Sequence, residues 1–306
     1  SLLDLIPAQT MKSKWVALYI REQRETYREE WLREVTAEPL DHVFVNEPVI
    51  AAILQHYQAK DDTGVIDYLL GTYCYTIARK EEALALMKDA YAKGLRHVVL
   101  LHNLGYMHLH VKHDAASAER YFAEALETGG AGSEAVLIWL DKIYAEQGNP
   151  EKRRGLIPHM ERASNKPLIL VPLVHIYADS GEEEKALHIL QTHEFENWEG
   201  QESSGPAYRN VIIRLAMKAL DAGDHTAAKQ WIDRVQDYPP NLNYGDSALT
   251  ALADVHYYRG LIYSKIGLKE EAAASFARGA AELVDDLVPK TDRSRKYSAL
   301  CLEQLK

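Results

Sequence analysis

The sequence of 306 residues has little of what several classes of protein require. Its two cysteines, Cys74 and Cys301, are too few for a disulfide framework and too far apart in sequence for a metal knuckle. No apolar run approaches the roughly 18 residues that a membrane span needs. We therefore expect a cytoplasmic protein with two buried thiols and no membrane contact.

Basic residues are in the minority. Lysine and arginine number 35 against 45 aspartates and glutamates, which gives a formal charge of −10. Nucleic-acid binding depends on basic side chains that neutralise phosphates, so this balance argues against a DNA or RNA partner. We expect any partner to be neutral or basic rather than acidic.

Motifs for catalysis and metal binding are also scarce. The segment Thr128–Ser133 has glycines but lacks the lysine of a phosphate-binding loop, and no serine nucleophile elbow occurs. Five histidines lie close together in sequence: His97, His102, His108, His110 and His113. His110 and His113 have the spacing of metal ligands on one helix face, beside Asp114. The alternative is a solvated helix end, which we favour, and we predict a non-enzymatic protein without metal or cofactor.

What the sequence does contain is repetition. One unit has five small or aromatic residues at fixed intervals: Gly260, Tyr263, Gly267, Ala272 and Phe276. The first glycine lets two helices approach closely, and the second ends the first helix in a left-handed conformation. The alanine lies where the second helix crosses the first. This pattern resembles the tetratricopeptide repeat (TPR).

The same frame fits upstream segments. Its anchors fall at 71, 105, 141, 174, 216 and 260, in steps of 34, 36, 33, 42 and 44 residues. Three of these steps are near the roughly 34 residues of a TPR. Two units, Leu140–Gly148 and Leu173–Ala186, lack the first glycine, and a one-residue slip puts Ala118 at the crossing of the second unit. The two long steps predict insertions near 194–206 and 237–247.

The resemblance implies an all-α fold, a right-handed superhelical solenoid of stacked antiparallel helix pairs whose concave face serves recognition. We expect N-terminal helices over 1–64, a repeat array over 65–285 and a capping helix over 286–306. Helical spacing predicts one helical stretch from Lys14 to Thr36 and another helix from Pro48 to Gln58, and degenerate repeats including Tyr27 and Pro39 are one interpretation of this part. The C-terminal helix has an apolar side, formed by Leu300, Leu302 and Leu305, that covers the last repeat or meets a second copy in a homodimer.

The resemblance also implies which residues line the groove, because TPR grooves use fixed positions of the first helix in each pair. Carried over position by position, the groove for a protein or peptide partner contains Tyr68, Thr72, Tyr75, His102, Tyr106, His110, Lys142, His175 and Tyr257. Tyrosine and histidine offer rigid area with polar tips, which suits a peptide. The alternative is that Tyr75 and Tyr106 pack against neighbouring helices.

A second resemblance covers the last third of the chain. Its motifs are Asn197–Gly200, Ala222–Asp224, Tyr238–Leu242 and Val255–Gly260. They are similar to the C-terminal repeat tail of large bacterial proteins that carry a galactose-mutarotase-like domain, although Asn243–Asp246 departs from that pattern. Two hypotheses follow. The chain is a binding scaffold, or it is an accessory or regulatory module of a carbohydrate-processing protein that uses Trp198 and the Tyr238–Tyr244 loop for contact.

Overall fold

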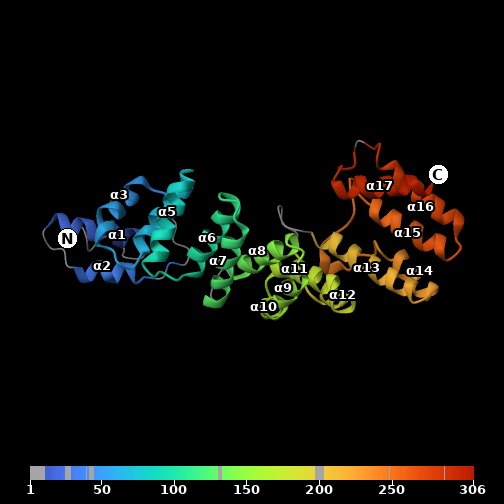
Figure 1. Cartoon of the computed structure of the whole chain (residues 1–306), viewed down its shortest axis with the longest axis horizontal. Helices are drawn as coiled ribbons and strands as arrows, with labels where there is room; N and C mark the ends of the chain where they lie inside the picture. The colour runs from blue at the N-terminus through green and yellow to red at the C-terminus, as the bar shows by residue number, and fades with distance from the viewer. Residues whose placement is uncertain are drawn as a thin grey trace. The chain divides into compact units, whose positions relative to one another are not determined.

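The computed structural model describes residues 11–24, 29–38, 40, 45–129, 133–196, 203–247, 249–285 and 287–306. In these ranges every regular element is helical and no strand occurs, which confirms the predicted all-α class. The chain divides into two compact units, Ser1–Glu146 and Gln147–Lys306, and Figure 1 labels most of their helices. The predicted repeat array extends across this boundary.

Unit 1 begins with three helices before the first clear pair. Its helices are α1 (Met11–Gln23), α2 (Glu29–Thr36), α3 (Pro48–Tyr57), α4 (Val65–Thr76), α5 (Lys80–Ala92), α6 (Val98–His110), α7 (Ala115–Thr128) and α8 (Ser133–Glu146), with a 3-10 turn η2 at Gln58–Lys60. The helical stretch predicted from Lys14 to Thr36 contains α1 and α2, and residues 25–28 of it lie outside the described part of the chain. Tyr27 and Pro39, which belong to the degenerate-repeat interpretation, lie outside the described residues. The helix predicted from Pro48 is confirmed.

The pairs α4–α5 and α6–α7 have the packing that the repeat pattern predicts. A Cβ atom on Gly105 in α6 would lie 2.7 Å from Cε1 of Phe122 in α7, so only glycine allows this approach. Ala118 is fully buried, which confirms the one-residue slip in this repeat. At Gly71 the opposing atom is Cγ of Met87 at 2.9 Å, and that side chain is flexible.

Unit 2 contains the remaining helices and both predicted insertions. They are α9 (Pro150–Gly155), α10 (Ile157–Arg162), α11 (Pro167–Asp179), α12 (Glu183–Thr192), α13 (Ser204–Asp221), α14 (His225–Asp233), α15 (Ala253–Lys265), α16 (Lys269–Ala281) and α17 (Asp292–Gln304), with a 3-10 turn η3 at Pro240–Leu242. Gly223 and Gly267 follow α13 and α15 with φ of 79° and 89°. The left-handed caps predicted for these two repeats are confirmed.

The short helices α9 and α10 replace the single second helix of a regular repeat. Pro158 stands in the first turn of α10, where its missing N–H removes a hydrogen bond that a continuous helix would need. The sequence contained this proline, yet the repeat frame alone did not predict the break.

The two insertions bind to each other. Asn241 Nδ2 donates to the carbonyl of Leu190 at 3.0 Å, and Phe195 N donates to the carbonyl of Asn241 at 2.9 Å. Asn243, in the left-handed region at φ 47°, donates from Nδ2 to the carbonyl of Phe195 at 2.9 Å. The first insertion is shorter than predicted, because α13 begins at Ser204 and accommodates Pro206 in its first turn.

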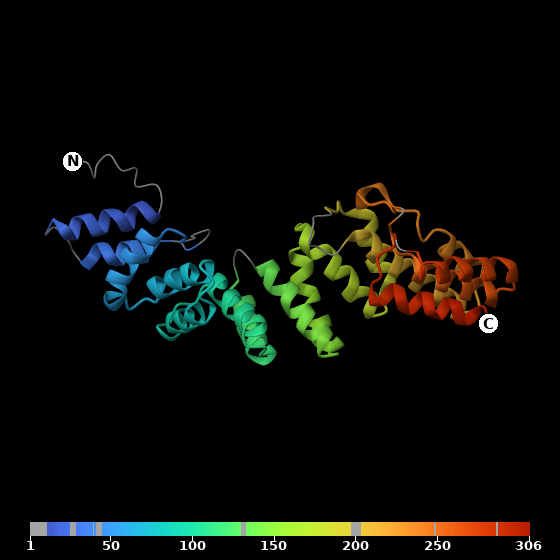
Figure 2. The same ribbon diagram turned by 90° about the horizontal axis from the view of Figure 1, so that it is seen from above.

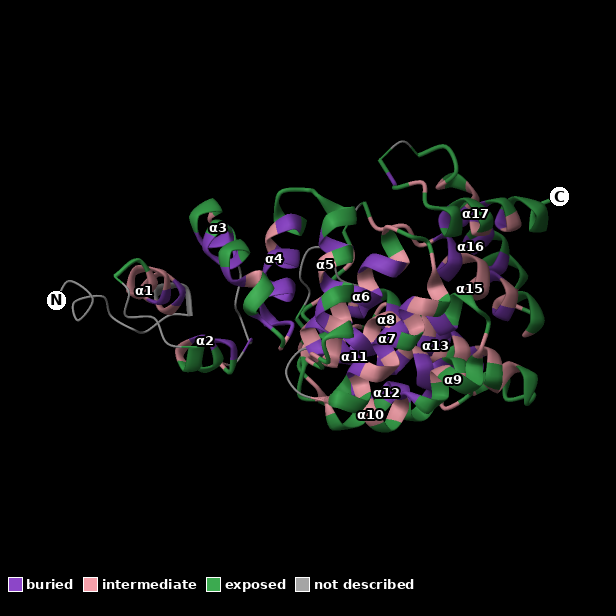
Figure 3. Cartoon of the chain, turned by 60° about the vertical axis from the view of Figure 1, so that its left-hand side comes forward, coloured by how far each residue is buried: buried purple, intermediate pink, exposed green. Residues whose placement is uncertain are grey.

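The helix α17 lies beside α15 and α16 (Figures 1 and 2). Its buried residues are small, Ser294, Ser298 and Cys301, and Tyr297 also packs against α15, whereas Leu302 and Leu305 are not buried. A Cβ on Gly279 would lie 2.5 Å from Cys301 Sγ, so this contact is close. On the apolar side predicted to cover the last repeat or meet a second copy, Leu300 is half-buried and Leu302 and Leu305 are exposed. Most helices have a buried and an exposed side, and both cysteines are buried free thiols as predicted (Figure 3).

Candidate binding surfaces

The first candidate surface lies in unit 1 and is built from rings on three first helices of successive pairs. We call Tyr75, Tyr106, His110 and Trp139 the aromatic surface. Tyr106 and His110 are four residues apart on α6 and therefore share a face, with ring centroids 4.4 Å apart. Trp139 of α8 meets both, at 5.6 Å from Tyr106 and 4.9 Å from His110. Burial, together with the nearby Tyr106 hydroxyl, raises the pKa of Tyr75 on α4.

Two further side chains border the aromatic surface. The His102 ring is stacked beside Tyr106 with centroids 6.4 Å apart, and burial lowers the pKa of His102, so this ring is neutral at pH 7. The Lys142 ammonium lies 4.8 Å from the centroid of the Trp139 ring, within cation–π range. The surface thus combines ring faces with one exposed cation.

The predicted groove residues of unit 1 fall into two groups. Tyr75, His102 and His110 come together around Tyr106, and Lys142 joins them through Trp139. Tyr68 and Thr72 are only 2% and 8% exposed, so their side chains offer almost no area to a partner. Trp139 was missed by sequence reasoning. Its position three residues before Lys142, on the same helix face, was the signal that could have identified it.

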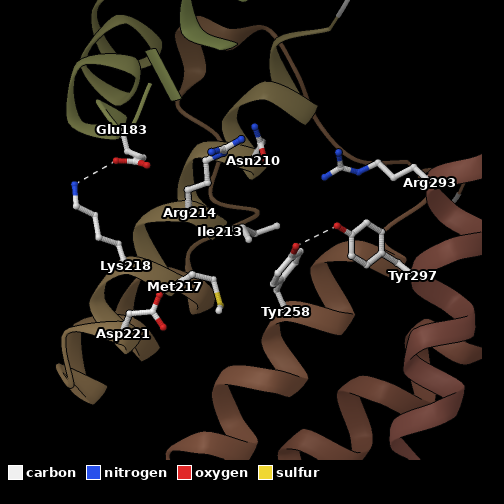
Figure 4. Close-up of a pocket in the computed structure, with 11 residues that line it drawn as sticks. Glu183, Asn210, Ile213, Arg214, Met217, Lys218, Asp221, Tyr258, Arg293 and Tyr297 are labelled. Carbon is white, nitrogen blue, oxygen red and sulfur yellow. Dashed lines mark hydrogen bonds and ion pairs between the residues drawn. The ribbon is translucent and has the colours of Figure 1, made fainter. Parts of the chain in front are cut away.

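The second candidate surface is a groove in unit 2, formed by two adjoining pockets of about 690 and 650 Å³. The first pocket is lined by α12, α13, α15, α17 and Gly181, and Figure 4 shows its side chains. The second is lined by α11, α13, the starts of α15 and α17, and loop residues that include Tyr244 and Thr250. Both are lined by Asn210, Arg214 and Arg293, so we treat them as one groove.

Ion pairs lie along the edges of the groove. Lys218 Nζ is 3.2 Å from Glu183 and 3.0 Å from Glu184, and Arg293 Nη2 is 2.8 Å from Asp254. The side chains of Lys218 and Arg293 are about half exposed, but those of Glu183 and Asp254 are only 10% and 11% exposed. A partner that displaces either cation must therefore supply a replacement for it, because an unpaired buried carboxylate is costly. The side chain of Asn210 makes no hydrogen bond to any described residue, and it lines both pockets, so its amide is available to a ligand.

A tyrosine pair forms one wall of the groove. The hydroxyls of Tyr258 and Tyr297 lie 3.1 Å apart, as the dashed line in Figure 4 marks. Burial, with a contribution from Tyr297, raises the pKa of Tyr258 to about 12, so the hydroxyl stays protonated. Of the predicted residues in unit 2, His175 lines the second pocket. Tyr257 packs against Tyr297 of α17 at 5.5 Å and lines neither pocket.

The loop predicted to contact carbohydrate makes hydrogen bonds within unit 2. The hydroxyls of Tyr238 and Tyr244 accept hydrogen bonds from Arg209 Nη1 at 2.9 and 3.3 Å. Trp198 and the rest of Asn197–Gly200 lie outside the described residues. The carbohydrate hypothesis therefore gains no support from this loop.

The histidines of α6 have separate environments. His97 caps the helix by accepting from Val99 N, and His108 Nδ1 lies 3.4 Å from Asp114. Among the described residues, no group of three or more histidine, cysteine, aspartate or glutamate side chains could hold a metal ion. Within the same ranges, no helix has both the length and the apolar character needed to cross a membrane.

Comparison with known proteins gives similarities at low identity. No protein-family model matches the chain. The C-terminal part of a TPR repeat-containing protein from Cytophaga hutchinsonii is 15% identical, with 81% of this chain and 93% of that chain covered and a TM-score of 0.48. A chain of the Naa15/Naa10 structure bound to HypK-THB is 15% identical, with 96% of this chain covered and a TM-score of 0.47, and this chain spans 39% of its length. A tetratricopeptide repeat protein from Parabacteroides merdae is 15% identical over 96% of this chain and 100% of that chain, with a TM-score of 0.37.

Proposed function

We propose that the chain is a non-enzymatic scaffold that binds a protein or peptide segment on the first helices of its pairs. The observation that carries the proposal is the groove of unit 2, where two pockets share Asn210, Arg214 and Arg293. Both pockets are lined largely by charged and polar side chains, whereas small-molecule sites are mostly apolar. A polar groove along several helices suits an extended or helical segment.

The aromatic surface of unit 1 supports the same function. Tyrosine and tryptophan supply large contact area at low entropy cost, and their mutual packing holds the rings in place before a partner arrives. The formal charge of −10 is a property of the whole chain, and it favours a partner that is neutral or basic overall. The two free thiols support a reducing, cytoplasmic location.

Affinity capture with quantitative proteomics tests the function. Asn210→Tyr fills the groove with a ring, and Tyr106→Ala removes the centre of the aromatic surface. Gln230→Ala on the exposed side of α14 serves as the matched control. We expect some proteins to be captured by the wild type and by the control but not by Asn210→Tyr or not by Tyr106→Ala. The far-UV circular dichroism of both variants should be unchanged. Capture of the same proteins by all variants would contradict the proposal.

A further inference from the structure

The second pocket of the groove contains a buried arginine that is only partly used. Arg209 on α13 is 6% exposed and lines this pocket. All hydrogen bonds that it makes to described residues start from Nη1, which donates to Tyr238, Tyr244 and Asp246. Nε is buried without a partner, and Nη2 donates no hydrogen bond to any described residue either.

The Nε and Nη2 groups of Arg209 form the edge of the guanidinium that can bind a planar anion through two hydrogen bonds. Nε and Nη2 project two parallel N–H groups, a spacing that matches the two oxygens of a carboxylate. A buried donor without an acceptor costs about 1–3 kcal/mol, so such groups in folded proteins call for an explanation. A ligand that supplies two acceptors at this edge provides one.

The surroundings of the pocket favour an anion. Arg214 and Arg293 line the same pocket as Arg209, and the aspartates in the lining are Asp179 and Asp254, so arginines outnumber carboxylates by three to two. Figure 4 shows Arg214 next to Asn210, and Arg293 on the neighbouring helix. Asp179 is shared, because it accepts from Arg153 at 2.6 Å as well as from Arg214. The N-terminus of the 13-residue helix α17 also borders the pocket and adds positive potential.

We infer that this pocket binds a carboxylate of the partner, with Arg209 as the anchor and Arg214 and Arg293 as further donors. The inference rests on the proposed function, because the carboxylate belongs to the bound peptide, either as an aspartate or glutamate side chain or as a free C-terminus. It also modifies the expectation from net charge. The chain as a whole is acidic, but this pocket selects an acidic group.

The second insertion then has a role in recognition. Asp246 Oδ1 accepts from Arg209 at 2.9 Å, and its Oδ2 accepts from Tyr238 at 2.9 Å and from Gln236 at 3.0 Å. These bonds fix one side of the guanidinium, so its Nε and Nη2 edge is oriented before a ligand binds. Preorganisation of this kind lowers the entropy cost of binding.

Titration with small carboxylates tests the inference without any peptide. The probes are acetyl-glutamate amide for the side-chain source and acetyl-glycine for the chain terminus, with acetyl-glutamine amide and acetyl-glycine amide as matched neutral controls. The readout is the ¹H–¹⁵N resonance of Arg209 Nε, assigned with Arg209→Lys, at constant ionic strength in sodium chloride. We expect a saturable shift with one or both carboxylates and none with the amides. The probe that binds more tightly identifies the source.

Variants separate binding from folding. Arg293→Gln changes a side chain that is 56% exposed, so we expect a folded protein whose affinity for the carboxylate falls about tenfold or more. Lys229→Gln, on the exposed side of α14, should leave the affinity unchanged. Absence of a saturable shift, an equal shift with the amides, or tighter binding of inorganic phosphate than of the carboxylates would overturn the inference.

The failure of this inference can be distinguished from failure of the proposed function. If captured proteins are lost in Asn210→Tyr but retained in Arg209→Lys and Arg293→Gln, the groove binds its partner without a carboxylate anchor. If no variant changes the captured proteins, the proposed function itself fails, whatever the small carboxylates do.

Discussion

The close contact between Gly260 and Phe276 gives a quantitative prediction for unit 2. A Cβ at position 260 would lie 2.5, 2.7 and 2.8 Å from three ring atoms of Phe276. At Gly155, the last residue of α9, a Cβ would meet nothing within 4 Å, and its φ is not in the left-handed region. The same substitution to alanine therefore meets a rigid ring at one site and open space at the other.

The two effects of a glycine-to-alanine change can be weighed against each other. Alanine in a helix is favoured over glycine by about 0.4–1 kcal/mol, largely through the unfolded chain. Forcing an extra methyl into a packed core costs about 1–3 kcal/mol. We expect Gly155→Ala to stabilise unit 2 by a few tenths to about 1 kcal/mol. Gly260→Ala should destabilise it by about 0–2 kcal/mol, a difference of roughly 1–3 kcal/mol between the variants.

Urea denaturation followed by far-UV circular dichroism measures both free energies of unfolding. Phe276→Leu provides a second test, because the smaller side chain leaves room for the methyl of Ala at position 260. In the double-mutant cycle we expect a favourable coupling of about 0.5–3 kcal/mol. The reasoning would be refuted if Gly260→Ala stabilised the protein as much as Gly155→Ala, or if the coupling were zero.

Three further predictions concern buried polar groups of the chain. Burial lowers the pKa of His256 to about 4. Its contribution to folding stability is therefore complete above about pH 6.5 and is lost as the pH falls toward 4, with a loss on the order of 2 kcal/mol at pH 5. His256→Leu should flatten the pH dependence of the urea midpoint between pH 7 and 5, and identical slopes for variant and wild type would contradict this. Burial raises the pKa of Cys301 to about 12 and also raises that of Cys74. Neither thiol should therefore react with Ellman's reagent at pH 8 until the protein is unfolded. Rapid labelling of the folded protein would contradict this prediction. Arg209→Met leaves Asp246 without its cation and should lower the free energy of unfolding by about 3–5 kcal/mol. Adding Asp246→Leu to this variant should restore much of the lost stability. Equal urea midpoints for the single and double variants would show that the two residues are not coupled.

The repeat pairs could be predicted from the sequence because their signals are local. Gly260, Gly267 and Ala272 lie within one repeat, and each has a steric role that any chain with this spacing must satisfy. The same reasoning placed Tyr106 and His110 on one face of a helix. These predictions needed only the period of the helix and the size of side chains.

Other features depend on contacts that no period encodes. Arg209 meets Tyr238 and Asp246, which are 29 and 37 residues away in an insertion outside the repeat frame. Tyr68 is buried although its repeat position predicts an open groove, and α3, which has no counterpart in the frame, packs against α4. Positional transfer from a family pattern therefore fails at the start of the array, where an additional helix packs against the first pair, and it cannot predict contacts made by insertions.

The bonds between the two insertions limit how this protein can be re-engineered. Repeat arrays are commonly treated as cassettes that can be deleted, duplicated or exchanged one pair at a time. Here Asn241 and Asn243 from the loop after α14 hold the carbonyls of Leu190 and Phe195 before α13. Deleting the α13–α14 pair together with either loop would leave the other loop without its acceptors or donors. The exchangeable module in this part of the chain is consequently the whole segment from Leu190 to Asp246, arginine anchor included.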